Sequence, residues 1–500
     1  MPKSATFISL GTISLDRSDH LPLYRQLYQS LRDAILSGQF APGTRLPSTR
    51  ALAQELGVSR NTAVNAYEQL IAEGFLESQI GSGTCVIDTL PDEIQHVKTR
   101  RNREKASSAA ARMIPPPRLS ERGTRLASTP FVEKSQARAF CPGLPAIDAF
   151  PLKVWGKLLH TSWQNLSISQ LGYNDVMGYW PLREAIVRYL QTARGVRCTP
   201  EQVLITNGAQ QALALSAALL LNRGDAAWLE NPCYHGAKAA LHSVGASIVP
   251  VTVDENGLVV NDGIAKAPYA RLAIVSPSHQ YPLGVTMSLT RRLQLLQWVH
   301  DAQAWILEDD YDSAYRYGGN PLAALQGLDD TGRVIYIGTF SKALLPSLRL
   351  GYMIVPPPLI EAFRALRAHA DRGNALLEQV ALTQFIAQGH FARHIRRMRS
   401  LYEQRQAVLV DAVKRYLDGL LLVEPNDTGL HLVGRLPEGV DDQLISRKLL
   451  AQGIDARALS SYTITPLSNS GLLLGYTAIP AAEIVAAVKQ MKPILADCVG

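Results

Sequence analysis

The stretch VIYIGTFSKALLPSLRLGY, residues 334–352, decides how the larger part of the chain is interpreted. It begins as an apolar, β-branched run, a pattern typical of a buried strand. Gly338 and Thr339 predict a turn, Lys342 follows just past the strand end, and Arg349 comes seven residues later. A lone lysine is nearly always a solvated surface charge. A lysine directly after a buried strand is less ordinary, and its meaning depends on what the neighbouring strands place beside it.

The chain from about residue 129 to residue 500 alternates strand-like and helical patterns. The strand-like runs are VLITNG, AAWLEN, RLAIVSP, AWILEDDYD, VIYIGTF and GYMIVP. This alternation predicts an α/β domain with a largely parallel sheet. Ligands of such sheets bind outside the carboxyl ends of the strands. Asp309 lies at the end of the run AWILEDDYD, so we expect Asp309 and Lys342 to face one crevice.

The residue types at these strand ends suit one cofactor, pyridoxal 5'-phosphate. A partly desolvated lysine with a lowered pKa can form a Schiff base with an aldehyde, and Lys342 is a candidate for that role. The cofactor also needs a carboxylate against its pyridine nitrogen, to keep the ring protonated, and Asp309 suits that position. Tyr311 could hydrogen-bond the phenolic oxygen of the ring. Tyr234, in ENPCYHG, could stack on the ring.

The phosphate of that cofactor needs an anion site. Hydroxyl and guanidinium donors are available on Thr339, Ser341 and Arg349. The stretch ITNGAQQALAL predicts a strand, a glycine turn and then a helix whose first amides, near Ala209 and Gln210, point outward. We therefore expect these two segments to bind phosphate.

Several motifs occur in a fixed order through residues 206–352, namely T-N-G-A-Q, N-P-x-Y, S-P-S-H-Q-Y-P-L-G, E-D-D-Y-D, T-F-S-K and L-R-L-G-Y. Together they resemble the fold-type I aminotransferases. The resemblance implies Lys342 as the catalytic lysine that holds the cofactor, Asp309 as the pyridine partner, and an obligate dimer with its sites at the interface. It also implies that Tyr173, in LGYNDVMGYWPLREAI, reaches the phosphate of the neighbouring subunit. The alternative for Tyr173 is an ordinary interface aromatic.

Two departures from the aminotransferase pattern put ordinary transamination in doubt. The asparagine of the N-P-T-G motif is replaced by Tyr281, so the hydrogen bond to the ring oxygen would come from Tyr311 alone or from Gln280. The C-terminal arginine that clamps the substrate carboxylate is also missing, with Leu473 at the expected place. Arg457, in GIDARALSSYT, is a possible substitute that would bind an effector; otherwise it is a surface arginine.

The N-terminal region has a different residue pattern, a series of short helical segments. Leucine and isoleucine recur every four residues at 23, 27, 31 and 35, which predicts a helix with one buried face, and Gly38 follows as a stop signal. In TRLPSTRALAQELGVSRNTAVNAYEQLIAEGF, Ser48 and Ser59 can each cap a helix and Gly57 lies between the two helices, which is helix-turn-helix spacing. The segment FLESQIGSGTCVI predicts a two-stranded hairpin, or wing, after them.

This region, over residues 21–87, resembles the GntR family of bacterial winged-helix regulators. Short polar residues at the start of the second helix suit base edges and phosphates. The resemblance implies a set of DNA contacts from both helices, the preceding turn and the wing. The residues expected to contact DNA are Arg45, Ser48, Arg50, Ser59, Arg60, Asn61, Thr62 and Gly81.

Composition limits the remaining possibilities. The chain has 500 residues, a net charge of +7 and five widely spaced cysteines, without a C-x-x-C pair. No run approaches the ~18 apolar residues of a membrane helix, and the N-terminus is a poor signal peptide. The cysteines argue for a reducing cytoplasm and against a structural metal. We expect domains at 1–88 and 129–500, joined by a basic, proline-containing linker at 89–128.

A GntR-type winged helix, a linker and an aminotransferase-like body in one chain resemble the MocR, or GabR-like, subfamily of regulators. The fold expected is multidomain, with an α+β winged helix-turn-helix joined to an α/β fold-type I transferase-like domain. The resemblance implies a cytoplasmic, nucleoid-associated regulator. It would form a domain-swapped homodimer on double-stranded DNA and sense an amine, an amino acid or pyridoxal phosphate itself. The competing hypothesis is an active aminotransferase with an accessory DNA-binding head.

Overall fold

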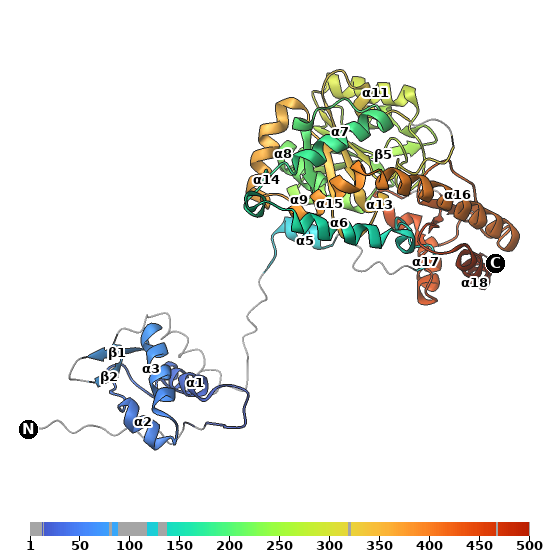
Figure 1. Ribbon diagram of the computed structural model, residues 1–500. Coiled ribbons are helices and arrows are strands. Elements are labelled where there is room, and N and C mark those ends of the chain that lie inside the picture. The colour runs from blue at the N-terminus through green and yellow to red at the C-terminus, as the bar shows by residue number, and fades with distance from the viewer. Residues whose placement is uncertain are drawn as a thin grey trace, which may run out of the picture. The chain divides into compact units, whose positions relative to one another are not determined.

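The computed structural model describes Ile13 and residues 15–79, 83–88, 118–128, 138–318, 322–466 and 469–499. The chain divides into two compact units, Met1–Pro117 and Arg118–Gly500, labelled by element in Figure 1. Nothing in either described part forms a helix long and apolar enough to cross a membrane.

The first unit, called the head below, is a winged helix. Its elements are α1 (Leu23–Leu36), α2 (Thr49–Glu55), α3 (Arg60–Ala72), β1 (Leu76–Gln79) and β2 (Gly83–Val86). The two strands pair antiparallel, as predicted for the wing. One buried cluster, with Leu27, Leu31 and Ile35 of α1 at its centre, joins the helices to the wing.

Both predicted helix caps are present in the head. The Ser48 hydroxyl accepts a hydrogen bond from the Ala51 amide at 3.2 Å, and the Ser59 hydroxyl accepts one from the Thr62 amide at 3.1 Å. Gly57 lies between the helices with φ +63°, a conformation that favours glycine. The caps satisfy amides at the start of α2 and α3 that have no partner within the helix, and so fix where the second helix begins.

The second unit, called the body below, is built on an eight-stranded sheet of order β3-β10-β9-β8-β7-β4-β5-β6. Strands β4, β5, β7, β8 and β9 run parallel, whereas β10 is antiparallel to both of its neighbours and β6 is antiparallel to β5. The strands are β3 (Val203–Thr206), β4 (Ala226–Asn231), β5 (Ser247–Asp254), β6 (Gly257–Leu258), β7 (Leu272–Val275), β8 (Trp305–Asp310), β9 (Val334–Thr339) and β10 (Gly351–Ile354).

Helices pack around this sheet (Figure 1). The α-helices are α5 (Glu121–Ala127), α6 (Leu152–Gln164), α7 (Trp180–Arg194), α8 (Ala209–Leu220), α9 (His235–Val244), α10 (Val260–Lys266), α11 (Leu289–Asp301), α12 (Leu325–Leu328), α13 (Phe340–Ala343), α14 (Ile360–Ala370), α15 (Leu376–Ala387), α16 (His390–Tyr416), α17 (Asp442–Ala451) and α18 (Ala481–Val499). The 3-10 helices are η1 (Ile147–Ala149), η2 (Ile168–Leu171), η3 (Pro200–Gln202), η4 (Pro346–Leu348), η5 (Pro357–Leu359) and η6 (Leu459–Tyr462).

A second, four-stranded sheet follows in the C-terminal part, with order β11-β12-β14-β13. Its strands are β11 (Leu422–Val423), β12 (His431–Arg435), β13 (Arg457–Ala458) and β14 (Gly471–Gly475). The long helix α16 and the C-terminal α18 pack with its buried side chains. These side chains continue the cluster that lies under α6, α7 and α15, so the large and small parts of the body share one core.

Strand β9 shows why the central sheet is buried on both faces. Ile335 and Ile337 pack into the cluster formed with α8 and α14, whereas Tyr336 packs into the cluster under α7 and α16. Side chains alternate between the two faces of a strand, and each face here has a helical layer. This explains why the run reads as continuously apolar, and the predicted α/β architecture is confirmed.

Two local features differ from the sequence expectation. Gly338 and Thr339 belong to β9 itself and do not form a turn. A Cβ atom at residue 338 would overlap the ring of Tyr352 on the adjacent strand, so glycine is needed there for packing. Helix α5 lies within the segment expected to be linker; Ser120 caps it and it packs against α9.

Candidate functional site

A cavity of about 400 Å³ lies at the carboxyl ends of the parallel strands. Ten residues predicted from the sequence line it: Ala209, Gln210, Tyr234, Asp309, Tyr311, Thr339, Ser341, Lys342, Arg349 and Arg457. They come from segments spread over some 250 residues of chain. The shared sheet edge brings them together, because the ends of β4, β8 and β9 point the same way.

Lys342 stands on the one-turn helix α13, three residues after β9 ends. Its Nζ atom donates a hydrogen bond to the carbonyl of Gly143 at 2.8 Å. Burial lowers the pKa of the Lys342 ammonium, while the negative charge of Asp312 acts in the opposite direction. A lysine with a lowered pKa has more of its neutral, nucleophilic form available near neutral pH.

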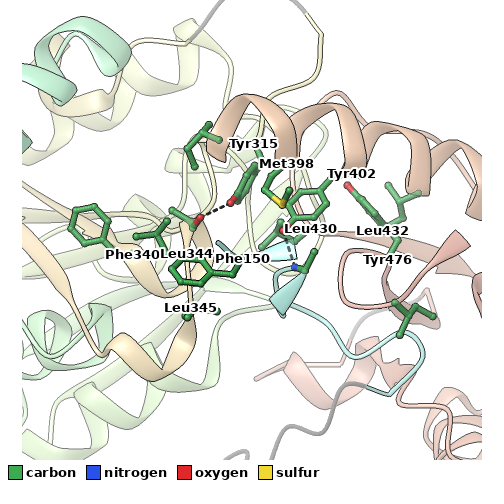
Figure 2. Packing of buried hydrophobic residues seen from close by; sticks show 14 of the residues in the cluster. Phe150, Tyr315, Phe340, Leu344, Leu345, Met398, Tyr402, Leu430, Leu432 and Tyr476 are labelled. Atoms are coloured by element: carbon green, nitrogen blue, oxygen red, sulfur yellow. Dashed lines mark hydrogen bonds between the residues drawn. The ribbon is translucent and has the colours of Figure 1, made fainter. Parts of the chain in front are cut away.

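The core fixes the backbone that carries Lys342. The Tyr315 hydroxyl donates to the carbonyl of Ala343, the next residue, at 2.7 Å. The Tyr315 ring in turn packs edge-on against Tyr402, with ring centroids 4.9 Å apart, and both rings lie among the buried side chains shown in Figure 2. The backbone beside Lys342 is therefore held by the main core cluster of the body.

Asp309 occupies the cavity end of β8 and is only 7% exposed. Burial raises the pKa of its carboxyl to about 7, and the charges of Asp310 and Asp312 add to the shift. Its Oδ1 atom has no hydrogen-bond partner within the described part of the chain. A buried carboxylate oxygen without a donor is costly unless a cationic donor is supplied. The protonated nitrogen of a pyridine ring is a donor of that kind.

Groups that can bind an anion lie at the start of α8. Gly208 precedes this twelve-residue helix with φ +82°, and the first amides of α8 lack partners within the helix. The Arg349 guanidinium stands close to Gly208 and donates from Nη2 to the carbonyl of Asn207 at 2.8 Å. Ser341 adds a buried hydroxyl that has no partner among the described residues. Helix amides, a guanidinium and a hydroxyl, all of which can donate hydrogen bonds to an anion, therefore line the same cavity.

Tyrosines form one wall of the cavity. Tyr234 follows β4, is 40% exposed and meets Tyr281 edge-to-face at a centroid distance of 6.0 Å. The Tyr281 hydroxyl donates to the Tyr462 hydroxyl at 3.2 Å. Tyr281, which stands in place of the asparagine of the aminotransferase motif, is therefore part of this aromatic wall.

Gln280 does not line the cavity, which corrects one of the two alternatives for the ring-oxygen hydrogen bond. Its amide nitrogen donates to the carbonyls of Pro232 and Tyr281, each at 2.8 Å, and its amide oxygen accepts from the Leu283 amide. These bonds hold the loop that carries Tyr281. Of the two candidates, Tyr311 alone faces the cavity.

Arg457 lies close to the place where the sequence pattern lacks an arginine. Its strand, β13, pairs with β14 so that Arg457 and Leu473 are directly opposite each other. Asp455 holds the guanidinium through Nε and Nη2, both at 3.1 Å, and Nη1 is not part of that pair. Arg457 thus lines the cavity from the strand adjacent to the one that lacks the arginine.

Tyr173 does not line this cavity. It is 89% exposed, and the guanidinium carbon of Arg372 lies 5.1 Å from its ring centroid. A contact between Tyr173 and a neighbouring subunit stays a prediction.

The residues expected to contact DNA lie on the head. Arg45, Arg50, Arg60 and Asn61 are exposed. Ser48 and Ser59 serve as helix caps, and the Ser59 hydroxyl is also 2.9 Å from that of Thr62. Arg45 pairs with Cys85 of β2 through a β-bridge and lies beside Gly83, so its side chain is placed at the wing. Gly81 is outside the described residues.

Sequence reasoning missed the segment from Cys141 to Leu144, which lines the cavity opposite the strand ends. It supplies the carbonyl that receives the Lys342 hydrogen bond, and Cys141 accepts a weak one from Arg457 at 3.7 Å. Gly143 has φ +74° and lies so close that a Cβ would be 3.0 Å from Nζ of Lys342. The only signal in the sequence is the Pro-Gly pair, which is common in turns.

Comparisons with known proteins agree with this geometry. Residues 151–491 match the family Aminotransferase class I and II, and residues 23–86 match Bacterial regulatory proteins, gntR family. The probable rhizopine catabolism regulatory protein MocR of Rhizobium meliloti is 44% identical over 466 residues, which cover 93% of this chain and 92% of that protein. The pyridoxine biosynthesis transcriptional regulator PdxR of Corynebacterium glutamicum is 30% identical over 471 residues, with 93% and 94% covered.

Among solved structures, the body is similar to LysN, the alpha-aminoadipate aminotransferase of Thermus thermophilus, complexed with N-(5'-phosphopyridoxyl)-L-leucine. The identity is 26% and the TM-score 0.68, with 75% of this chain and 97% of that chain covered. The head therefore carries a GntR DNA-binding fold and the body a fold-type I aminotransferase fold. The chain belongs to the MocR-type GntR family of transcription regulators, in which a DNA-binding head is joined to an aminotransferase-like body.

Proposed function

We propose that the body binds pyridoxal phosphate and uses it to sense a small amine or amino acid, or senses the cofactor itself, and that this changes how the head binds DNA. One observation carries the proposal. A single cavity combines a lysine of lowered pKa, a buried carboxylate oxygen that has no donor among the described residues, and the open start of α8 beside an arginine. These are the three features that pyridoxal phosphate needs from a protein.

Each residue of the cavity has a role in this proposal. When bound, pyridoxal phosphate supplies an aldehyde carbon that reacts with primary amines. Lys342 would bond that carbon, and Asp309 would accept a hydrogen bond from the ring nitrogen; both residues line the cavity. Tyr234 would stack on the ring and Tyr311 would donate to its phenolic oxygen. The phosphate donors are the amides near Ala209 and Gln210 with Thr339, Ser341 and Arg349.

The effector class is supported by the chemistry of the cavity more than by the relatives. The two relatives are named for different processes, rhizopine catabolism and pyridoxine biosynthesis, so their names point to no common ligand. With the cofactor bound, a primary amine would compete with Lys342 for the aldehyde carbon, and Arg457 would bind a carboxylate on that amine. Such an exchange releases Lys342 and provides the differential affinity for two conformations that a switch requires.

We propose a homodimer as the working state, with each head beside the body of its partner and the two heads on spaced half-sites of a double-stranded operator in the cytoplasm. Tyr173 would then reach the phosphate site of the neighbouring subunit. The proposed dimer is supported by the exposure of apolar side chains in the segment that precedes Tyr173. Trp163 is 63% exposed, Ile168 90% and Leu171 62%. Exposed apolar patches of this kind are typical of protein interfaces.

The test of the proposed function is a screen of primary amines and 2-amino acids against the cofactor-loaded protein. Each compound is scored for a change in the absorbance of the bound cofactor and, in the same sample, for a change in operator affinity. A compound that does both, without multiple turnovers at ordinary enzyme rates of roughly 1 to 1,000 per second, supports a sensor. Failure of the protein to bind the cofactor at all would reject the proposal at its first step.

Arg60 is expected to be required for operator binding. It is exposed at the first position of α3, where a recognition helix presents side chains to base edges. Arg60→Ala should weaken operator affinity about tenfold to a hundredfold at fixed salt, the range expected for one base-reading arginine. Arg25→Ala, which removes an exposed arginine from α1, is the control for the lost charge. Equal losses in the two variants would count against a recognition role for α3.

Arg457 is expected to select amines that carry a carboxylate. Arg457→Gln should weaken the spectral response to γ-aminobutyrate about tenfold or more, because a charge-assisted hydrogen bond is lost. The response to butylamine, which lacks the carboxylate, should change little. Arg447→Gln, at an exposed position on α17, is the matched control. A similar loss of spectral response to both amines would show that Arg457 supports the cavity wall and does not bind the carboxylate.

A further inference from the structure

His279 contacts the hydroxyl of Tyr311 but does not itself line the cavity. Its Nδ1 atom is 2.8 Å from the Tyr311 hydroxyl oxygen and 2.8 Å from Oδ2 of Asp312. His279 and Asp312 are 1% and 2% exposed, so bulk water does not compete for either contact. One ring nitrogen therefore connects a buried carboxylate to the phenol that lines the cofactor cavity.

The Asp312 carboxylate determines which nitrogen of His279 carries a proton. An ionised carboxylate can only accept hydrogen bonds, so an Nδ1 atom 2.8 Å away must donate. A bare nitrogen lone pair at that distance would face the negative charge with no proton between them, in a buried setting where the repulsion is large. The proton is therefore on Nδ1, whether the imidazole is neutral or charged.

The surroundings hold the His279 ring in this orientation. A Cβ atom on Gly284 would lie 3.1 Å from Nε2, and one on Gly429 would overlap the ring, so two glycines bring loops directly against it. The His431 ring centroid is 5.4 Å away, and its own Nε2 donates to the carbonyl of Pro282. Burial lowers the pKa of His431 to about 3, so this neighbour is neutral. Turning His279 over would place a carbon against Asp312.

We propose that His279 and Asp312 are positioning residues that hold the Tyr311 hydroxyl as a hydrogen-bond donor into the cavity. The Nδ1–H group is shared between the Asp312 carboxylate and the Tyr311 oxygen, so Tyr311 accepts on that side. The Tyr311 proton then has two acceptors to choose from, the Asp312 carboxylate, which also hydrogen-bonds Tyr311, and on the cavity side the ring oxygen that the cofactor would supply. The inference deepens the proposed function and rests on it, because only the bound cofactor supplies that second acceptor.

The tautomer of His279 can be measured without the cofactor. In protein labelled with ¹⁵N-histidine, a long-range ¹⁵N–¹H correlation spectrum distinguishes a protonated Nδ1 from a protonated Nε2, and His279→Asn identifies the resonance. We expect a protonated Nδ1 in the unmodified protein. A neutral ring with the proton on Nε2 would overturn the proposal directly.

The effect on the cofactor is measured with a double-mutant cycle. The readout is the pH midpoint at which the absorbance spectrum of bound pyridoxal phosphate changes. Tyr311→Phe removes a donor to the anionic ring oxygen, so the midpoint should rise by about one to two pH units. Asp312→Asn removes the charge that keeps the proton on Nδ1, so the midpoint should rise by a substantial part of that amount. Combining the two substitutions should add nothing to Tyr311→Phe.

The outcomes separate this inference from the proposed function. If the unmodified protein shows no cofactor absorbance, the proposed function fails, while the tautomer measurement still decides the geometry. The positioning role is wrong if the cofactor binds but Asp312→Asn leaves the pH midpoint unchanged. It is also wrong if Asp312→Asn shifts the midpoint by the same amount in the parent protein and in Tyr311→Phe. His279→Asn provides a rescue test, because its amide can supply an N–H in place of Nδ1, and the midpoint should then stay close to that of the parent protein.

Discussion

Replacing Lys342 with alanine is expected to abolish the visible absorbance of protein-bound pyridoxal phosphate while leaving a folded protein. The side chain lies in the cavity, and no other lysine lines it in the described chain, so no second amine can take over the covalent bond to the cofactor. Affinity should fall by at least about a hundredfold, because non-covalent contacts at the ring and phosphate remain but the bond to Nζ is lost. The head should still bind the operator, without a response to amines.

The fold should tolerate this change for a physical reason. Lys342→Ala leaves the Gly143 carbonyl without its donor, which costs about 1 to 3 kcal/mol. Part of that is offset, because burial already disfavours the charged ammonium, as its lowered pKa shows. The backbone of α13 stays fixed by the bond from Tyr315 to Ala343, which does not involve the lysine side chain.

Two further variants make the Lys342 result specific. Lys342→Arg keeps a cation and a donor for Gly143 but cannot form the covalent bond, so it should lose the absorbance as well. Lys492→Ala removes an exposed lysine from α18 and should leave the absorbance unchanged. Absorbance spectroscopy with dialysed protein, together with circular dichroism, checks all three. A normal spectrum for Lys342→Ala would remove the basis for assigning the cofactor.

The strand ends explain why so much of the site could be predicted from the sequence. Asp309, Lys342 and the start of α8 each follow a continuous apolar run, and a parallel sheet brings the ends of such runs to one edge. The helix caps of the head could be predicted for a similar reason, because Ser48 and Ser59 accept hydrogen bonds from amides only three residues away. Local rules and one rule of sheet topology were sufficient for these residues.

Long-range contacts explain what the sequence could not show. The carbonyl that receives the Lys342 hydrogen bond belongs to Gly143, which is 199 residues earlier in the chain. Gln280 has the right chemistry to reach a ring oxygen, but three hydrogen bonds to its own loop and to Pro232 hold it elsewhere. The pairing of β13 with β14, which places Arg457 opposite Leu473, depends on a register that no local pattern specifies.

Asp309→Asn is expected to have opposite effects on cofactor binding and on the stability of the cofactor-free protein. The pKa of Asp309 is raised to about 7 in the folded protein by burial and by Asp310 and Asp312, whereas an unfolded aspartate has a pKa of about 3.9. Between these two values the folded state binds more protons than the unfolded state, so stability decreases as pH rises. Above pH 7 the whole penalty is present, at most about 4 kcal/mol.

Asparagine has almost the same shape and no charge, so Asp309→Asn should remove this penalty. We expect the cofactor-free variant to be more stable than the parent protein at pH 8, by about 1 to 3 kcal/mol, and by only about a third of that amount at pH 5. Cofactor affinity should fall about tenfold to a hundredfold, because the charged partner of the ring nitrogen is lost. Urea unfolding at both pH values and titration with pyridoxal phosphate measure the two effects.

The pH dependence should not vanish entirely in the variant, and this provides an internal check. Burial also raises the pKa of Glu230 to about 8 and of Glu308 to about 7, and these carboxyls destabilise the folded state in the same direction as pH rises. Asp301→Asn, at an exposed position on α11, should change neither stability nor affinity. If Asp309→Asn instead destabilised the cofactor-free protein at pH 8, the carboxylate would have a partner in the apo state. Its free oxygen could then no longer mark the place of the pyridine nitrogen.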